Sequence, residues 1–479
     1  MGVKGFFNEC KAAAEVCTLK EYAVKHGYET NNRNWRSLVL GVDANNLLDM
    51  CRGASKALQV KSIHSASALE IFFKTLCLLS AAPVSLLFVF DGPNRPKIKR
   101  GVKVITDNDP VLYRQALKFI RAFSYRSTMA PGEADCLLAA LAKNKVIDGV
   151  ISDDSDMIFL GIPLVFRKLR GPNSKDIRYQ VYTPKSVQDA TGLTRGGLVL
   201  TALLSGSDHD DGVDGCGIKT AIDIAKNTAL GEELLEYASL YAETPDYLDE
   251  SLDAWRNSLR LQISFNPRGK LNKHYPTISE RITARFPDRK ALRFYVNYPP
   301  PVPGTLPSME PRLLAISTVV SACREMFKWT DNHMLRRFKG SGIWEGALLR
   351  LLYSPRLYYD KPSHSFHEGV FQAGFVKTSP KHQFRGGLRC ARVTFCMETL
   401  TALSDLEVPR GTSMKRAVWV PLSVFQVAKA SKPLPSQQPA VNEPGANYID
   451  IDSDSEEEDA GYVESPHYKV DFGILYVVH

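Results

Sequence analysis

The chain has 479 residues, more than one hydrophobic core usually holds, so we expect two or three domains. Its 44% hydrophobic and 23% charged residues are ordinary for a globular protein, and its longest uncharged apolar run, residues 75–90, is too short to span a bilayer. The nine cysteines are scattered and form no Cys-x-x-Cys pair. Their spacing argues against a zinc module or a disulfide framework and favours a reducing compartment.

The charge is unevenly distributed. The net charge is +8, but residues 441–465 contain nine acids and no lysine or arginine. The remainder, with 60 cationic and 43 acidic residues, carries +17. A basic body with an acidic tail predicts a polyanionic partner for the body, most simply a nucleic acid.

Two apolar runs in the first hundred residues predict buried strands. Residues 38–42 and 84–90 are continuous apolar stretches, and an acid follows each of them directly, Asp43 and Asp91. Residues 66–80 between them have the apolar spacing of a helix. Strands that alternate with helices indicate an α/β fold with a parallel sheet covered on both faces.

The next stretch repeats this arrangement with more acids. Glu133 and Asp135 follow a Pro-Gly turn and begin a predicted helix, and a short strand at 146–151 ends on Asp154 and Asp156. Such acids alone are often turn formers, helix caps or a solvated loop. Because three predicted strands end on carboxylates at the same sheet edge, we favour a site.

A Gly-rich turn follows a second pair of helices. We predict strands at 163–169 and 179–182, a helix starting at Thr183-Pro184, and a helix at 197–204 that leads to Asp208. The next helix begins near Ile218, and free amides at its start favour a phosphate. An ordinary helix–turn–helix connection is the alternative. The predicted contacts with DNA here are Gly212, Gly215, Gly217, Lys219 and Thr220.

The predicted site contains only oxygen ligands. All-carboxylate ligation selects Mg²⁺ or Mn²⁺, and this number of acids suits two ions about 4 Å apart that act on a phosphodiester. A basic cluster follows Asp91 and would hold the scissile strand, unless it is a solvated loop. The seven candidate ligands are Asp43, Asp91, Glu133, Asp135, Asp154, Asp156 and Asp208, and the basic cluster is Arg95, Lys97, Lys99, Arg100 and Lys103.

Residues 1–225 resemble the flap endonuclease/XPG family of structure-specific nucleases. The matching pieces, in family order, are MGVKGF, GVDANNLL, FVFDGP, APGEAD, SDDSDMIFLG and GSDHDDGVDGCGIKTAIDIA. The resemblance implies a PIN-like core, two divalent metals bound by the seven carboxylates, and a helix-two-turn-helix that holds duplex DNA with a monovalent cation such as K⁺. It also implies that Gly2 lies near the metals and that Lys99 is a catalytic lysine, with Arg100 beside it.

Within that family the chain looks like the GEN/Yen subgroup of Holliday-junction resolvases. Only residues 92–130, which include a predicted helix at 113–125, fill the place of the long helical arch of flap endonucleases. The resemblance implies paired symmetric nicks by a homodimer assembled on a four-way junction, and nuclear localisation. The chain departs from the family in having Asp135 where glutamate is usual and His209 where tyrosine is common.

The resemblance and the patterns together predict five units. These are a nuclease core at 1–205, a helix-two-turn-helix region at 206–298, a helical segment at 299–355 that completes the core, a β-rich chromodomain-like module at 365–430, and a disordered acidic tail at 431–479. We expect the module to be separate from the core, and aromatics of the helical segment such as Phe338 and Trp344 to be core residues.

Two other functions remain open. One is a 5′-flap endonuclease or exonuclease with the same metals, and the other is a catalytically silent scaffold that binds DNA junctions. In the tail, Ile449–Ile451 followed by an acidic run is similar to a SUMO-interacting motif, with a solvated acidic tail as the alternative.

Overall fold

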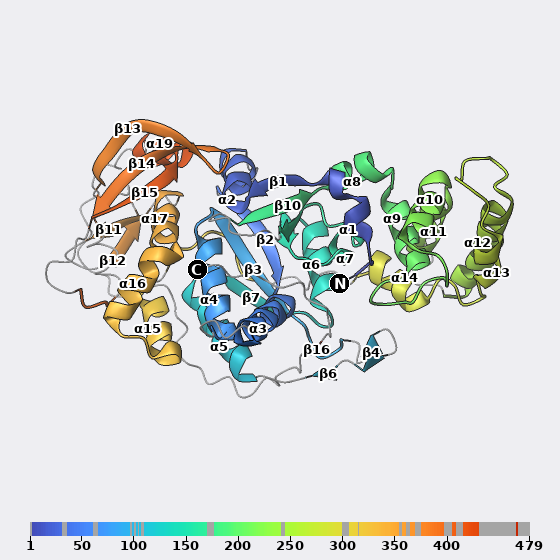
Figure 1. Ribbon diagram of the computed structural model, residues 1–479, viewed down its shortest axis with the longest axis horizontal. Helices are drawn as coiled ribbons and strands as arrows, with labels where there is room; N and C mark the ends of the chain where they lie inside the picture. Colours follow the sequence, from blue (N-terminus) through green and yellow to red (C-terminus); the bar gives the residue numbers. More distant parts are fainter. Residues whose placement is uncertain are drawn as a thin grey trace.

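The central feature of the molecule is a twisted sheet with a helical lobe at one end and a small β-rich unit at the other (Figure 1). The structure, a computed structural model, describes residues 2–30, 36–60, 66–95, 98–99, 102–103, 105–106, 110–169, 177–240, 245–298, 306–314, 316–353, 357–360, 365–368, 375–396, 405–408, 415–430 and 466–467.

The sheet has seven strands in the order β1-β10-β9-β8-β2-β3-β7. Five of them, from β9 to β7, are parallel to their neighbours, while β10 pairs antiparallel with β9 and with the edge strand β1. This arrangement confirms the predicted α/β fold and the predicted strand pair near residues 163–182. The bounds are β1 Glu15–Thr18, β2 Leu38–Asp43, β3 Val84–Phe90, β7 Arg126–Met129, β8 Gly149–Ile151, β9 Val165–Lys168 and β10 Arg178–Tyr182.

Alternate residues of the central strands enter two different hydrophobic clusters. In β2, Leu40 and Val42 belong to the cluster on one face, while Val39 belongs to the cluster on the other. Burial on both faces explains why these strands are apolar throughout rather than alternating. The parallel strands therefore bring their C-terminal ends, and the acids that follow them, to one edge of the sheet.

The first face is covered by helices from both ends of the chain. Aromatics of α4, α5 and α16 meet there, with Phe73 5.3 Å from Phe119 and 6.3 Å from Phe338 between ring centroids. Phe338 and Trp344 are buried, which confirms their predicted place in the core. The helices on this face are α2 Leu19–Tyr22, the π-helix η2 Ala23–Glu29, α3 Ala44–Val60, α4 Ala68–Ser80, α5 Pro110–Ala122, α15 Ile316–Phe327, α16 Asp331–Ser341 and α17 Ile343–Tyr353.

The packing of α5 corrects the predicted arch. Its residues Ala116 and Phe119 are fully buried, as is Phe123 just after it, and the following strand β7 is part of the central sheet. The helix predicted at 113–125 is therefore a core element and not part of a bridge over the site. Only residues 92–109 are left to form an arch, and eight of these eighteen lie outside the described residues.

The second cluster extends from the sheet into the helical lobe. It joins Val39 of β2 to Leu203 of α9 and, further out, to Trp255 of α12. The helices on this side are α1 Phe6–Glu9, the 3-10 helix η1 Lys11–Ala13, α6 Ala134–Lys143, α7 Asp156–Phe159, α8 Pro184–Thr191, α9 Arg195–Ser205, α10 Ile218–Asn227, α11 Leu230–Leu240, α12 Pro245–Phe265, α13 Pro276–Arg281 and α14 Arg289–Val296.

The β-rich unit lies at the opposite end of the molecule from this lobe (Figure 1). Its strands β13 Phe375–Arg385, β14 Leu388–Cys396 and β15 Lys415–Pro421 form an antiparallel sheet, and α19 Leu422–Ala430 follows. The strands predicted near 388–395 and 417–420 are confirmed, while the one predicted at 369–371 lies outside the described residues. Cys390, Val393 and Val424 belong to the same cluster as the first face of the sheet, so the unit packs against the core. Its assignment as a module of its own stays a prediction.

Short strands complete the described parts. A hairpin joins β11 Leu357–Asp360 to β12 Ser365–Glu368, β4 Ile98–Lys99 pairs with β5 Val102–Lys103, and β6 Ile105–Thr106 pairs with β16 Pro466–His467. The rest of the acidic tail, including Ile449–Ile451, lies outside the described residues, so its predicted disorder is not tested. In the described parts, no helix is long and apolar enough to cross a membrane, and no two cysteines form a disulfide.

Candidate metal centre

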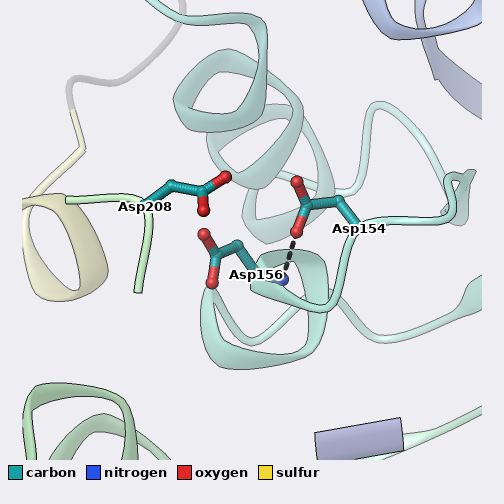
Figure 2. Close-up of side chains that lie close together, drawn as sticks. All are labelled: Asp154, Asp156 and Asp208. Atoms are coloured by element: carbon teal, nitrogen blue, oxygen red, sulfur yellow. Dashed lines mark hydrogen bonds between the residues drawn. The ribbon is translucent and has the colours of Figure 1, made fainter. Parts of the chain in front are cut away.

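Three of the predicted carboxylates converge at one point, and we call them the acidic trio. Asp154 lies in the loop after β8, Asp156 begins α7, and Asp208 lies in the loop after α9. Their ligand oxygens all lie within 4.8 Å of one another (Figure 2). Asp154 and Asp156 are buried and Asp208 is half-buried. Three carboxylates so close together repel one another, and a cation would offset this repulsion.

Neighbouring groups orient each member of the trio. The amide of Asp156 donates to Oδ1 of Asp154 at 2.9 Å, the amide of Gly2 donates to Oδ2 of Asp208 at 3.2 Å, and the hydroxyl of Tyr295 donates to Oδ1 of Asp156 at 3.1 Å. Groups that hold metal-binding carboxylates in this way set the geometry of the centre.

Gly2 is close to the trio because it has no side chain. Its φ of +72° is in the left-handed region, and an added Cβ would lie 2.4 Å from Oδ1 of Asp154 and 2.8 Å from the amide nitrogen of Asp156. Another residue would be strained and would collide with the backbone of α7. The structure thus brings Gly2 to the predicted site.

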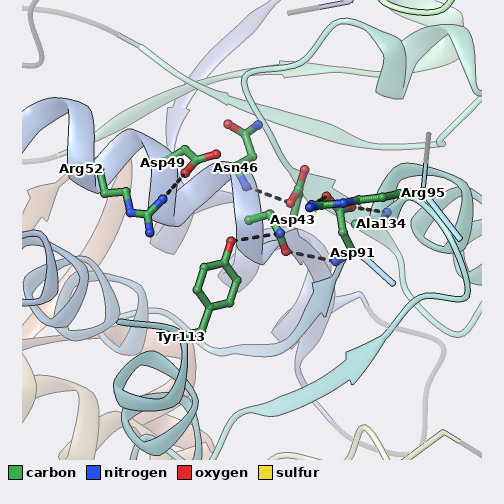
Figure 3. A network of polar contacts seen from close by, with 9 residues as sticks. Asp43, Asn46, Asp49, Arg52, Asp91, Arg95, Tyr113 and Ala134 are labelled. Atoms are coloured by element: carbon green, nitrogen blue, oxygen red, sulfur yellow. Dashed lines mark hydrogen bonds and ion pairs between the residues drawn. The ribbon is translucent and has the colours of Figure 1, made fainter. Parts of the chain in front are cut away.

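Two more acids lie at the ends of neighbouring parallel strands, and we call them the strand-end pair. Asp43 is the last residue of β2 and accepts a hydrogen bond from the amide of Asn46 at 3.0 Å. Asp91 follows β3, accepts from the amide of Ala134 at 2.9 Å, and lies 3.6 Å from Nη1 of Arg95 (Figure 3). Ala134 is the first residue of α6, so the positive end of that helix points at Asp91.

Burial disfavours the charged form of the carboxylates in and near the strand-end pair. Burial first, and then the charge of Asp91, raises the pKa of Asp43 well above its ordinary value, and Asp154 of the trio contributes as well. Nearby, burial raises the pKa of Asp49 to about 6 although Arg52 lies 3.3 Å away. The charges of Asp91 and Asp154 both act on Asp43, so the pair and the trio repel each other electrostatically. A divalent cation would offset this repulsion.

Glu133 and Asp135 complete the set of seven at the start of α6. Glu133 precedes the helix, and its Oε2 lies 3.7 Å from Nδ1 of His209. The other ring nitrogen of His209 lies 3.9 Å from Oδ2 of Asp156. His209 thus stands between α6 and the trio. Asp135 lies in the first turn of α6 with its Oδ1 shielded from solvent.

The residues present fit a hard divalent cation. The trio offers only carboxylate oxygens, at separations that one ion can bridge, and Mg²⁺ and Mn²⁺ prefer such ligands. Among the described residues, the trio is the only group of three or more acidic, histidine or cysteine side chains that lies this close together. The strand-end pair and Glu133 adjoin it without forming a second group as compact.

The Gly-rich turn between α9 and α10 has the geometry of a close backbone contact. Gly212 and Gly215 have φ values of +77° and +79°. Gly217 caps α10, and no described atom lies within 4 Å of the position that a Cβ would take there. Lys219, in the first turn of α10, is exposed and Thr220 is half-buried. The backbone at Gly217 is therefore open to a ligand.

The predicted basic cluster is only partly described. The side chain of Arg95 is 8% exposed and pairs with Asp91, so Arg95 lies inside the acidic site rather than on an open surface. The structure describes Lys99 and Lys103 only as backbone, in β4 and β5, while Lys97 and Arg100 lie outside the described residues. The roles predicted for these four lysine and arginine side chains stay predictions.

Sequence reasoning missed a dense basic segment and two supporting residues. Residues 266–293 contain eight cations and two acids, a ratio that would have been a usable signal. Tyr295 and Arg195 gave no signal, because only folding brings the first to Asp156 and the second to the carbonyls of Phe159 and Tyr295. The exposed cations are Arg268, Lys270, Lys273, Arg281, Arg285, Arg289, Lys290 and Arg293.

An ion pair joins this basic segment to the Gly-rich turn. Nη1 of Arg281 lies 2.9 Å from Oδ2 of Asp214 and donates to its carbonyl at 3.1 Å. The same nitrogen would lie 2.6 Å from a Cβ at Gly215. Arg281 of the basic segment therefore lies against the turn.

Comparison with known proteins finds a family match for one region of the chain. Residues 126–208, which contain Glu133, Asp135 and the whole acidic trio, match the XPG I-region family. The matched region runs from β7 to the loop after α9.

Curated relatives are similar to this chain over part of its length. It is 26% identical over 231 residues to human flap endonuclease GEN homolog 1, a match covering 44% of this chain and 25% of the relative. It is 30% identical over 138 residues to flap endonuclease 1-A of Sorghum bicolor, covering 29% of this chain and 35% of the relative. The matches thus span a quarter to a third of the relatives' lengths.

Solved structures of similar fold cover most of the chain. One is the Holliday junction-resolving enzyme GEN1 in complex with product DNA and a Mg²⁺ ion, with a TM-score of 0.66, 24% identity, and coverage of 89% of this chain and 96% of that one. Another is the eukaryotic junction-resolving enzyme GEN-1 binding with potassium, with a TM-score of 0.67, 23% identity, and coverage of 89% and 96%. These likenesses establish a GEN-like fold.

Proposed function

We propose that this chain is a divalent-metal-dependent endonuclease that cuts phosphodiester bonds in branched DNA, with the four-way junction as its preferred substrate. The acidic trio carries the proposal, because three carboxylates whose oxygens lie within 4.8 Å of one another form a hard-cation site at a sheet edge. The GEN-like fold and the XPG I-region support it.

The chain's own side chains would hold two ions. The trio would hold one, and Asp43, Asp91 and Glu133, with Asp135 nearby, would hold the other. When bound, the ions would lower the pKa of a water and stabilise the leaving oxygen of the phosphodiester. Gly2 and Tyr295 keep the trio in place through the hydrogen bonds that they donate. Arg95, next to Asp91, offers positive charge to the scissile phosphate, and Lys99 is a second candidate for this role.

The duplex arm of the substrate would lie along the lobe. The open backbone at Gly217 and exposed Lys219 suit a phosphate, with K⁺ as a further partner of the turn. The basic segment at 266–293 extends this positive surface through the contact between Arg281 and Asp214. Phosphate contacts of this kind position DNA without reading its sequence.

The short connection across the site favours a junction over a flap. Because α5 and β7 are core elements, only residues 91–109 connect β3 to α5. So few residues are poorly suited to enclose a threaded single strand, whereas an open site accepts a continuous duplex. Two copies on one junction would give paired nicks, and nuclear localisation follows from such a substrate. SUMO binding by Ile449–Ile451 is a proposal from the sequence alone.

The test compares two substrates of matched sequence, an immobile four-way junction and a 5′ flap, each with Mg²⁺. We expect paired symmetric nicks on the junction and little cutting of the flap. Asp154→Ala should abolish cleavage and keep junction binding, whereas Asp189→Ala, a control at an exposed acid on α8, should cleave normally.

The alternatives make different predictions for this assay. Cutting of the flap alone would make the chain a flap endonuclease. Binding of the junction without cleavage by the wild-type protein would make it a scaffold. Cleavage retained by Asp154→Ala would overturn the assignment of the metal centre.

A further inference from the structure

His209 lies inside the acidic site, although the pattern of carboxylates gave it no role. It directly follows Asp208 of the trio, and its side chain is 9% exposed. Nδ1 lies 3.7 Å from Oε2 of Glu133, and Nε2 lies 3.9 Å from Oδ2 of Asp156. The two ring nitrogens thus face carboxylates from two different parts of the site.

Both of these distances are too long for a direct hydrogen bond, which ends near 3.2 Å. Separations of this size would suit two ligands of one ion, because two metal–ligand bonds placed end to end span at most about 4.2 Å. One ion can therefore contact an imidazole nitrogen and a carboxylate oxygen at the observed separations after a small adjustment.

The surroundings hold the imidazole in this orientation. Its ring stacks on Phe294 of α14, with the centroids 3.5 Å apart and the planes 28° from parallel. The next residue of α14, Tyr295, donates its hydroxyl hydrogen bond to Asp156. The backbone amide of His209 also donates to Oγ of Ser207 at 3.2 Å. The same helix therefore fixes the ring and one carboxylate of the trio, as a preorganised ligand set requires.

We propose that His209 is a nitrogen ligand of this metal centre and makes it select transition-metal ions such as Mn²⁺ over Mg²⁺. Carboxylate and water ligands suit both Mg²⁺ and Mn²⁺, but an added imidazole nitrogen, a softer ligand, favours the transition ion over Mg²⁺. A site with one imidazole among its carboxylates therefore discriminates more strongly between these two ions than an all-carboxylate site. This inference rests on the proposed metal centre and adds to it a determinant of which ion is bound.

The test is pulsed electron paramagnetic resonance of the full chain with Mn²⁺, which detects a directly coordinated ¹⁴N nucleus and needs no DNA. We expect ¹⁴N coupling in the wild type and its loss in His209→Tyr, which keeps an aromatic ring on Phe294 but removes the nitrogens. The matched control is His274→Tyr, at an exposed histidine after α12, which should keep the coupling.

A second measurement on the same variants is the preference between ions. The ratio of the Mg²⁺ to the Mn²⁺ dissociation constant should fall by about 10-fold in His209→Tyr and stay unchanged in His274→Tyr. If His209→Tyr does not fold, His209→Asn takes its place, and the wild-type spectrum alone remains decisive.

Each outcome bears on the inference. Mn²⁺ bound without ¹⁴N coupling in the wild type, or coupling that persists in the His209 variants, overturns it. An unchanged ratio of dissociation constants overturns the proposed selectivity between the two ions. Coupling in a protein that cleaves no DNA leaves the ligand assignment standing and refutes the proposed function, whereas no Mn²⁺ binding at all refutes both.

Discussion

The acidic trio and the strand-end pair contain the same chemical group but are assembled differently. Asp43 and Asp91 follow two adjacent parallel strands, so sheet pairing alone brings them together. The trio gathers acids from a loop, a short helix and a distant loop, and Gly2 and Tyr295 orient two of them. The pair is thus assembled by the pairing of two adjacent strands, whereas the trio is assembled by packing between distant segments.

The sharpest way to test this comparison is to neutralise one acid from each group. Asp154→Asn and Asp91→Asn should each slow cleavage at least about 1,000-fold, because each removes a ligand charge from one of two required ions. Titration calorimetry with Mn²⁺ should show one ion lost in each variant. The loss of both ions in either variant would mean that the two groups form a single site.

A smaller effect should appear behind the strand-end pair, at Asp49. Its folded-state pKa of about 6 exceeds the ordinary 3.8, because burial disfavours the charged form. The folded state therefore binds this proton more tightly than the unfolded chain, and the resulting stability is complete below pH 3.8 and lost as pH rises through 6.

Comparison with Asp49→Asn isolates this contribution. From pH 4 to pH 7 in chelator, the free energy of unfolding of the wild type should fall relative to the variant by at most about 3 kcal/mol. Urea unfolding at a series of pH values measures the difference. A difference that does not change with pH would contradict the assigned burial of this carboxyl.

The smallest of these effects concerns the support of the trio by Gly2. Gly2→Ala should weaken metal binding about 10- to 100-fold, because the added Cβ displaces Asp154 and strains the backbone. The control is Gly340→Ala in α16, where no described atom lies within 4 Å of the new Cβ. Equal metal affinities of the two variants would show that the trio does not need Gly2.

The sequence by itself determined the sheet, its buried strands and the acids that follow them. Continuous apolar runs such as residues 84–90 predict strands buried on both faces, and parallel strands place Asp43 and Asp91 at one edge whatever surrounds them. The Gly-rich turn before α10 is also predictable from the sequence, because its pattern lies within a few consecutive residues.

Only the tertiary structure decided which distant residues complete the site. Tyr295 reaches Asp156 across 139 positions of sequence, and His209 stands between Glu133 and Asp156 because α14 supports its ring. The same holds for α5, whose apolar spacing predicts a helix but not whether it covers the core or bridges the site. Apolar periodicity indicates which face of a helix or strand is buried. It does not indicate what that face packs against, because the partner comes from a distant part of the sequence.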